Sequence, residues 1–480
     1  MQTYSQWIDG QWCEANDGAQ IDVINPATEM CVARVPASQS ADALHAMQAA
    51  KRAQVGWARM SGIERAAIIV KAGQLMQERI DAIATAITLE QGKPIAHARM
   101  EVMGGIGHLN YHSEWARRMA GSTLPADRRN AHMLTFKLPY GVVVSLIPWN
   151  FPVAVLCRKI GPALMAGNAV VAKPAEVTPV SALLVARCFA DAGLPAGVLN
   201  VVTGRGREVG EALVKHPDTQ IVTLTGSVEV GQRVMLSAAE HLTMVSLELG
   251  GKAPFIVMDD ADLDAAATDC VISRFRNAGQ ICTSNERTYV HAAVFETFAR
   301  KVVEKTRALR IGDPMGDVDM GPKINRPELD KVERMVQQAI DLGARVLTGG
   351  HRPQGNGFDR GYWFEPTVLV DVKQTHPLVQ EEVFGPVLPI LPFENFDEAL
   401  GMANDSDFGL SSYLYTNNYN HVMRAMTELD FGEVFVNRIG PEAVHGYHTG
   451  YRKSGIGGDD GQYGFETYLK KKTVYLQYKA

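Results

Sequence analysis

A thiol and a carboxylate, each beside small turn-forming residues, are the side chains of this sequence best suited to covalent chemistry on a carbonyl group. Cys282 lies in the run NAGQICTSNER (277–287), and Glu248 opens the run ELGGK (248–252). A thiolate can add to a carbonyl carbon, a carboxylate can activate water, and glycines let a substrate approach the backbone closely. Because a lone cysteine is usually a small buried hydrophobic residue, Cys282 needs support from other motifs.

Two further runs provide that support. IPWNFP (147–152) lies upstream of this pair, and EVFGP (382–386) lies downstream of it. In this order the four runs closely resemble those of the NAD(P)-dependent aldehyde dehydrogenase superfamily. The resemblance extends from WIDGQW (7–12) to SGIG (454–457), so it covers essentially the whole chain.

The resemblance implies hydrolytic, non-acylating oxidation of an aldehyde. Cys282 would form a thiohemiacetal, and the Asn150 amide with the Cys282 backbone N–H would stabilise its oxyanion. Glu248 would activate the water that hydrolyses the later thioester. The alternation along 245–249 supports this role, since it places Glu248 opposite the apolar face at a strand end. From the residues alone, a solvent-facing carboxylate fits Glu248 equally well, and a turn residue before Phe151 and Pro152 is the favoured interpretation of Asn150.

The cofactor implied by the resemblance is NAD. The run GRGREVG (204–210) is only loosely similar to a dinucleotide fingerprint, because it has one residue too many before the last glycine. Glu176 would accept hydrogen bonds from the adenosine ribose and would repel the 2′-phosphate of NADP. For Trp149 and Phe384, which would flank the nicotinamide, ordinary core packing is the alternative. The residues expected to bind the cofactor are Ile147, Trp149, Lys173, Glu176, Gly206, Gly210, Gly226, Ser227, Leu249, Glu382 and Phe384.

Three polar residues predict the kind of aldehyde. Arg158, Glu442 and His448 stand at positions that are often aromatic or apolar in the resembled family. Such a pocket would hydrogen-bond a polar aldehyde and would leave buried polar groups unpaired beside an alkyl one. With the run 446–458 and the ending VYLQ (474–477), they resemble the bacterial lactaldehyde/glycolaldehyde subgroup. Thr283 departs from the Asn that this subgroup tends to have after the nucleophile, so we expect a difference in substrate placement there.

Other substrates and other classes of protein stay open. Succinate semialdehyde ranks second, because Arg158 would pair with its carboxylate although Glu442 would partly cancel the field, and an aromatic aldehyde ranks third. Arg158 and His448 could also be a helix-end charge and a loop residue without a substrate role. A thiol hydrolase would need a histidine partner, which the runs around Cys282 and Glu248 lack. A non-catalytic paralogue is disfavoured, because the thiol, the amide and both glutamates are present.

Composition, net charge and the distribution of apolar residues exclude some partners and predict the cellular compartment. Hydrophobic residues make up 46%, charged residues 21%, and the net charge is -6, which disfavours nucleic acid or an anionic membrane as the main partner. The start has no basic region followed by an apolar stretch, and no window approaches about eighteen apolar residues, so we expect neither a signal peptide nor a membrane span and predict a cytoplasmic protein. The cysteine spacing predicts neither a metal site nor a disulfide scaffold.

The elements that must position these residues follow an α/β pattern. Residues 142–147, 169–172, 198–202, 221–224 and 244–249 read as strands that alternate with helices, which predicts a parallel, Rossmann-type sheet with helices on both faces. Thr178 and Pro179 predict the cap and first turn of one of these helices, and Gly193 predicts its end. Amphipathic helices are expected at 41–57 and 63–89, after an initial strand pair. Helices at 295–309 and 329–342, with strands at 387–391 and 434–436, predict a second α/β unit.

A chain of 480 residues is too long for one compact core. We expect a NAD-binding domain of residues 1–120 and 140–250 and a catalytic domain of residues 251–460. Residues 121–139 and 461–480 would form a small β element, which the resemblance implies to be the contact of a homo-oligomer, either a dimer or a tetramer. The residues themselves show only that 473–478 alternates like an edge strand.

Overall fold

Five parallel strands form the centre of the computed structural model, which describes residues 2–479. Every side chain of the first three is buried, as their apolar runs predict. The predicted parallel sheet is therefore confirmed for this part of the chain. The five strands are β8 (Val142–Leu146), β9 (Ala169–Lys173), β10 (Leu199–Val201), β11 (Thr219–Thr225) and β12 (Met244–Glu248).

Three antiparallel strands extend this sheet to eight, in the order β22-β12-β11-β8-β9-β10-β2-β3. They are β2 (Gln6–Ile8), β3 (Gln11–Cys13) and β22 (Gly455–Ile456). The sequence did not predict β22, which pairs with β12 and places Gly455 opposite Glu248. Because β22 takes the edge, β12 is an interior strand.

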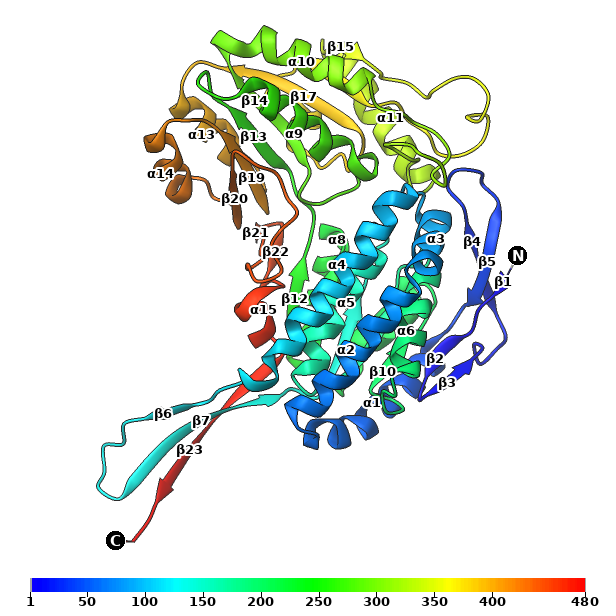
Figure 1. Ribbon diagram of the computed structural model, residues 1–480, viewed down its shortest axis with the longest axis vertical. Coiled ribbons are helices and arrows are strands. Elements are labelled where there is room, and N and C mark those ends of the chain that lie inside the picture. The colour runs from blue at the N-terminus through cyan, green and yellow to red at the C-terminus, as the bar shows by residue number, and fades with distance from the viewer. Residues whose placement is uncertain (1, 480) are drawn as a thin grey trace.

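Helices cover both faces of the eight-stranded sheet (Figure 1). Val143 of β8 packs into a core shared with α2 to α6, whereas Val142 and Val144 pack into a second core with α1, α7 and α8. This arrangement was predicted from the strand–helix alternation. The helices are α1 (Ser40–Arg59), α2 (Gly62–Glu78), α3 (Ile80–Gln91), α4 (Ile95–Ser113), α5 (Pro152–Met165), α6 (Val180–Asp191), α7 (Glu211–Val214) and α8 (Val228–Ala238).

Two details of the N-terminal region differ from the prediction. The expected helix at 63–89 is two helices, because the backbone at Arg79 leaves the helical conformation with φ -107° and ψ 17°. The expected strand pair is five short strands. Besides β2 and β3, they are β1 (Gln2–Thr3), β4 (Gln20–Ile24) and β5 (Cys31–Pro36), which form a separate small sheet.

The start of α6 is capped differently from the prediction. No capping hydrogen bond comes from Thr178 in the part of the chain that the structure describes, and Pro179 stands just before the helix. Glu90, at the end of α3, accepts from the backbone N–H groups of Val180 at 2.7 Å and Ser181 at 3.0 Å instead. A buried carboxylate can accept both bonds at once, which a single hydroxyl cannot do equally well. Gly193, with φ 87°, follows the helix end as predicted.

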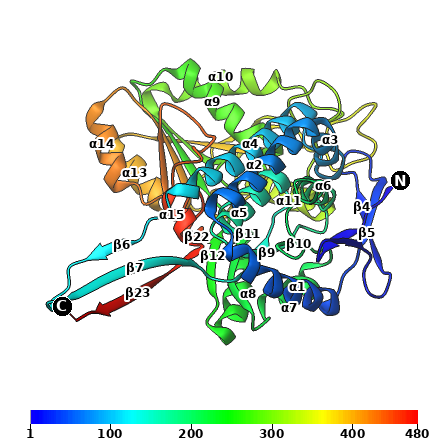
Figure 2. The same cartoon turned by 60° about the horizontal axis from the view of Figure 1, so that its bottom comes forward.

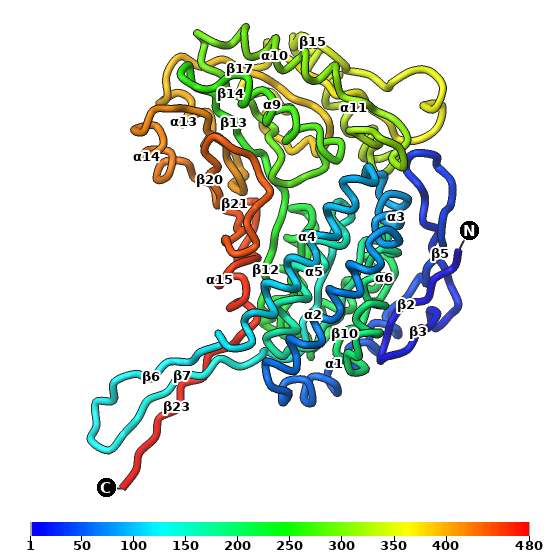
Figure 3. Tube along the Cα trace, viewed as in Figure 1, coloured from blue at the N-terminus to red at the C-terminus, as the bar shows by residue number. Residues whose placement is uncertain are grey.

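A second sheet of seven strands has the order β15-β16-β17-β14-β13-β19-β20, and only β15 is antiparallel. The strands are β13 (Ala253–Val257), β14 (Asn285–His291), β15 (Arg345–Thr348), β16 (Thr367–Val370), β17 (Val387–Phe393), β19 (Ser411–Tyr415) and β20 (Glu433–Val436). The helices are α9 (Leu263–Phe275), α10 (Phe295–Arg307), α11 (Arg326–Asp341), α12 (Pro377–Gln380), α13 (Phe396–Asn404) and α14 (Tyr419–Glu428). The predicted second α/β unit is thus present, and β12 leads directly into it (Figure 3).

A three-stranded ribbon projects from the body of the molecule (Figures 1 and 2). It consists of β6 (Ser122–Leu124), β7 (Ala131–Pro139) and β23 (Leu469–Gln477), with β23 at one edge, as the alternation of its residues predicts. Helix α15 (Gly461–Glu466) precedes β23, and the short strands β18 (Phe408–Gly409) and β21 (Tyr451–Arg452) pair with each other. None of the helices between residues 2 and 479 is long and apolar enough to cross a membrane.

Candidate active site

Cys282 lies on a tight loop between α9 and β14. Three successive residues before it, Asn277, Ala278 and Gly279, have left-handed backbones with φ of 51°, 55° and 70°. A Cβ on Gly279 would meet the carbonyl oxygen of Gly385 at 2.2 Å, so the loop is pressed against the EVFGP run. Small residues are therefore required here, because a larger side chain would separate the two loops.

The two glycines after Glu248 bring three predicted motifs together. A Cβ on Gly251 would meet the carbonyl oxygen of Cys282 at 2.1 Å, and one on Gly250 would meet Glu382 Oε2 at 2.8 Å. The Gly251 backbone N–H donates to Glu382 Oε1 at 2.7 Å. The ELGGK run thus lies between the nucleophile loop and the EVFGP loop, at the junction of the two sheets.

Glu248 is buried at the carboxyl end of β12 and is only 3% exposed. The alternative of a solvent-facing carboxylate on an edge strand is therefore wrong. Neither of its oxygens accepts a hydrogen bond from any residue the structure describes, but Oε2 lies 3.4 Å from His448 Nε2. Burial raises the pKa of the Glu248 carboxyl to about 8, although His448 acts in the opposite direction. A carboxylate with this pKa is a stronger base than an ordinary one.

Asn150 is buried beside the loop that carries Cys282. Its Nδ2 donates to the carbonyl oxygen of Gln280 at 3.0 Å, and both Asn150 and Cys282 line one cavity. A side-chain amide has two N–H donors, so one is still available to an oxyanion at the thiol. The geometry is compatible with the predicted oxyanion role.

A buried ion pair that the sequence reasoning missed holds the Asn150 segment. Lys93 Nζ donates to the Asn150 carbonyl oxygen at 2.8 Å and pairs with Glu101. The other Glu101 oxygen accepts from the backbone N–H groups of Val153 at 2.9 Å and Ala154 at 3.3 Å, at the start of α5. Lys93 and Glu101 follow α3 in a region that reads only as helix and turn, so no local signal distinguishes them.

A second missed residue, Glu286, joins the nucleophile and cofactor loops. Its carboxylate accepts from the backbone N–H groups of Val383 and Phe384, both at 2.8 Å, and from Lys252 Nζ at 2.7 Å. Arg274 lies 3.3 Å away. Burial opposes ionisation, but Lys252 and Arg274 lower the pKa of Glu286 to about 2. The charged carboxylate of Glu286 therefore orders the backbone of the EVFGP run. Glu286 belongs to the NAGQICTSNER run, and this position is the sequence signal from which it could have been predicted.

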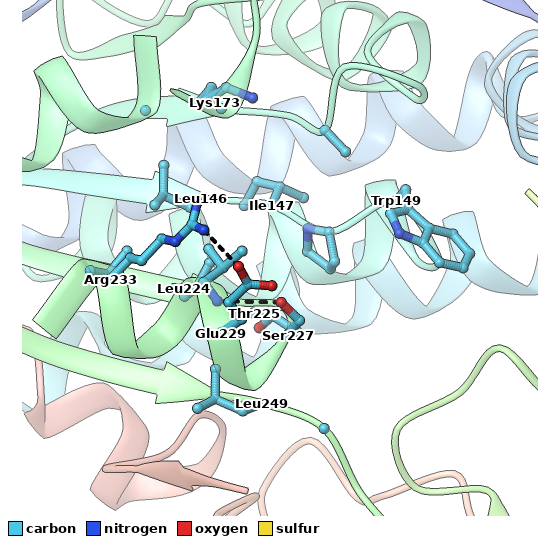
Figure 4. A pocket seen from close by; sticks show the side chains of 18 of the residues that line it. Leu146, Ile147, Trp149, Lys173, Leu224, Thr225, Ser227, Glu229, Arg233 and Leu249 are labelled. Atoms are coloured by element: carbon cyan, nitrogen blue, oxygen red, sulfur yellow. Dashed lines mark hydrogen bonds and ion pairs between the residues drawn. The ribbon is translucent and has the colours of Figure 1, made fainter. Parts of the chain in front are cut away.

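A cavity of about 740 Å³ opens beside Cys282 at the carboxyl ends of the parallel strands. Figure 4 shows Ile147 and Trp149 after β8, Leu224 at the end of β11 and Ser227 at the start of α8 around it. Trp149 meets Phe384 edge to face, with ring centroids 5.5 Å apart. All eleven residues predicted to bind the cofactor line this cavity: Ile147, Trp149, Lys173, Glu176, Gly206, Gly210, Gly226, Ser227, Leu249, Glu382 and Phe384.

The cavity has the size and the donors that a nicotinamide dinucleotide requires. Ser227 caps α8 by accepting from the Val230 N–H at 3.3 Å, and the cavity is lined by Gly226, Ser227 and Glu229, so the N-terminus of this helix lies at the cavity. Burial lowers the pKa of Lys173 to about 8, and Glu176 acts in the opposite direction. A Cβ on Gly250 would fill the space beside Glu382. The residues present fit a dinucleotide.

The three predicted substrate residues lie close to one another, with His448 beside Glu248, and do not line that cavity. Arg158 Nη2 lies 3.9 Å from Glu442 Oε2 and 2.9 Å from Asp460 Oδ2. His448 Nδ1 lies 3.1 Å from Glu433 Oε1. Asp460 and Glu433 were not predicted, because nothing in their local sequence relates them to Arg158 or His448.

His448 also contacts the thiol. Its side chain is within hydrogen-bonding reach of Cys282, and it is 2% exposed. The runs next to Cys282 and Glu248 lack a histidine, as stated above, but the fold brings one near the thiol. The loop after β20 brings His448 in from a distant part of the sequence.

Comparison with known proteins identifies the family of the chain. The model of the aldehyde dehydrogenase family matches residues 12–474. The chain is 45% identical over 479 residues to 3,6-anhydro-alpha-L-galactose dehydrogenase of Vibrio sp. (strain EJY3), covering 100% of each chain. It is 44% identical over 476 residues to lactaldehyde dehydrogenase of Escherichia coli (strain K12), covering 99% of this chain and 98% of that one.

A solved structure is equally similar. The structure of 3,6-anhydro-L-galactose dehydrogenase in complex with NADP matches with a TM-score of 0.97 and 45% identity, covering 99% of this chain and 100% of that chain. The predicted fold is thereby confirmed. The chain belongs to the aldehyde dehydrogenase family and is an oxidoreductase that acts on aldehydes with a nicotinamide cofactor.

Proposed function

We propose that this protein oxidises a small polar aldehyde of the lactaldehyde or glycolaldehyde type irreversibly to its carboxylic acid, with NAD as the oxidant. The observation that carries this proposal is the paired charge of Arg158, which lies against Asp460 and near Glu442. A cluster with compensated charge offers hydrogen bonds but little net field, which suits a neutral hydroxyaldehyde. The 44% identity to a lactaldehyde dehydrogenase supports the same substrate class.

Three residues of the chain, Cys282, Asn150 and Glu248, would carry out the steps of the proposed oxidation. Cys282 Sγ adds to the aldehyde carbon, and the second Asn150 amide N–H and the Cys282 backbone N–H donate to the oxyanion. The nicotinamide, when bound, supplies the acceptor for the hydride. Glu248 takes a proton from water, the water oxygen attacks the thioester carbonyl, and the sulfur leaves as a thiolate while the acid is released. Trp149 and Phe384 meet edge to face in the lining of the cavity that also contains Cys282.

Succinate semialdehyde is the second candidate, because Arg158 is a cation that could bind its carboxylate. Two carboxylates already face that guanidinium, so a substrate carboxylate would have to displace Asp460 or share the cation with it. This competition places succinate semialdehyde below a hydroxyaldehyde. Values of kcat/KM for lactaldehyde, glycolaldehyde, succinate semialdehyde and benzaldehyde test the order.

Substituting Arg158→Leu should discriminate between these substrates. We expect kcat/KM to fall by about one to two decades more for lactaldehyde than for propanal, because only the hydroxyaldehyde loses a buried polar contact. Steady-state kinetics with both aldehydes measure the difference. Arg118→Leu, at an exposed ion pair with Glu114, is the control and should leave both values unchanged.

Two results would contradict the hydroxyaldehyde proposal. A loss confined to succinate semialdehyde would make Arg158 an anion-binding residue. An equal loss with every aldehyde would make Arg158 a structural residue without a role in specificity.

Glu176 should determine the choice of cofactor. The wild-type enzyme is expected to prefer NAD strongly, and Glu176→Ser should raise kcat/KM for NADP by about tenfold or more, because a carboxylate no longer repels the 2′-phosphate. Glu211→Ser is the matched control, since Glu211 also lines the cavity but pairs with Lys215. Equal use of NAD and NADP by the wild-type enzyme would refute the assignment.

We also propose that the chain forms a homo-oligomer through the ribbon of β6, β7 and β23. The ribbon projects from the body and exposes Leu124, Phe136, Tyr475 and Leu476, apolar side chains that a second copy could cover. Its two edge strands, β6 and β23, offer unpaired backbone groups to such a neighbour.

A further inference from the structure

His448 lies between two carboxylates, near enough to the reacting sulfur to lower the pKa of the thiol. Nε2 lies 3.4 Å from Glu248 Oε2 on β12, and Nδ1 lies 3.1 Å from Glu433 Oε1 on β20. The side chain is 2% exposed and lowers the pKa of Cys282 on the nucleophile loop. One imidazole therefore lies between the proposed nucleophile and the proposed general base. Its neighbours come from both sheets and from the nucleophile loop.

The charges around this imidazole are predominantly negative. Besides Glu248 and Glu433, the carboxylates of Glu442 and Asp460 act on it, and Arg158 lies beyond them against both. Burial opposes a charge on the ring, but Glu248 and Glu433 outweigh it and raise the pKa of His448 well above its ordinary value. An imidazolium in this position is paired through Nδ1 with Glu433, and it gains a second charged partner at Nε2 when Glu248 ionises near pH 8.

We infer that His448 is a buried imidazolium that stabilises the thiolate of Cys282 and is thus a catalytic residue in addition to lining the substrate pocket. The inference rests on the proposed function only in taking Cys282 as the nucleophile. The step is an ionisation in which the Sγ–H bond breaks, the proton passes to solvent, and the electron pair stays on sulfur beside the cation. No oxidant or other co-reactant takes part.

Competing effects on the thiol explain why such a cation is needed. Burial raises the pKa of Cys282, and the charges of Glu442 and Glu248 raise it further, whereas His448 lowers it. A thiol surrounded by carboxylates in a buried loop would stay protonated near neutral pH, and a protonated thiol is a poor nucleophile. His448 opposes these effects at the sulfur itself.

Alkylation of Cys282 by iodoacetamide measures this effect without aldehyde or cofactor. The rate is followed from pH 6 to 10 by mass spectrometry of the peptide that contains Cys282, so other cysteines do not interfere. In His448→Gln the midpoint should move to higher pH by about one unit or more, and the rate at pH 7 should fall about tenfold or more. His448→Lys should restore most of the rate, because it keeps a cation between Glu248 and Glu433.

Glu442→Gln is the control of opposite sign. It removes a negative charge that acts on the thiol, so alkylation should become faster at pH 7. If His448→Gln does not fold, as judged by its circular dichroism and melting curve, His448→Asn serves as the second neutral variant.

Coincident pH profiles for the wild-type enzyme and the neutral variant would overturn the inference. Equal slowing in the Gln and Lys variants would also do so, because it would assign the effect to packing instead of charge. Failure of the substrate proposal is a separate result, since it would appear in the kcat/KM values and would leave the alkylation profiles unchanged.

Discussion

Substituting Cys282→Ala is expected to abolish NADH production and to leave NAD binding nearly intact. The thiol forms the only bond between protein and substrate in the proposed reaction, so kcat should fall by about five orders of magnitude. Cys282 is one residue in the lining of the cavity, whereas α8 and the loops after β8, β9 and β11 contribute many more. Absorbance at 340 nm and titration of NAD by calorimetry measure the two quantities.

Cys13→Ala is the matched control, because Cys13 is a half-buried cysteine on β3 at the far edge of the eight-stranded sheet. It should retain wild-type turnover. Measurable steady oxidation of any aldehyde by Cys282→Ala would end the covalent mechanism.

Substituting Glu248→Gln should separate the two halves of the reaction. Hydride transfer needs no base at this position but hydrolysis does, so we expect one burst of NADH per site followed by a steady rate about 10²–10⁴-fold below wild type. Rapid mixing measures the burst, and intact-protein mass spectrometry should find the acyl group on Cys282. A missing burst would mean that Glu248 acts before the thioester forms.

The pH dependence tests the same residue in the wild-type enzyme. Glu248 acts as a base only when ionised, and its pKa is raised to about 8 by burial, so the ionised fraction increases as the pH rises through 8. The rate of thioester hydrolysis should therefore rise between about pH 7 and 9, since a tenfold change in ionisation spans one pH unit. The Gln variant should lose this rise. A flat wild-type profile across this range would show that another group is the base.

The sequence by itself determined the fold class and the motifs of the site. Apolar runs such as 142–147 and 169–172 can be buried only in a covered parallel sheet, so the alternation of strands and helices predicts the cofactor unit directly. The glycines of ELGGK and NAGQICTSNER predicted close backbone contacts. In the structure Gly251 lies against Cys282, and Gly279 lies against Gly385. These signals are local, which is why they could be read from residue order.

Only the tertiary structure decided which polar side chains meet. The sequence gives no reason for Glu90 to cap α6, for Lys93 to hold Asn150, or for His448 to touch Cys282. Each of these contacts joins segments from different elements, and its energy depends on burial, which removes water as a competing partner. Buried polar groups take partners wherever the chain brings them, so strand order and loop paths, including the return of β22 to β12, fix the electrostatics around the thiol.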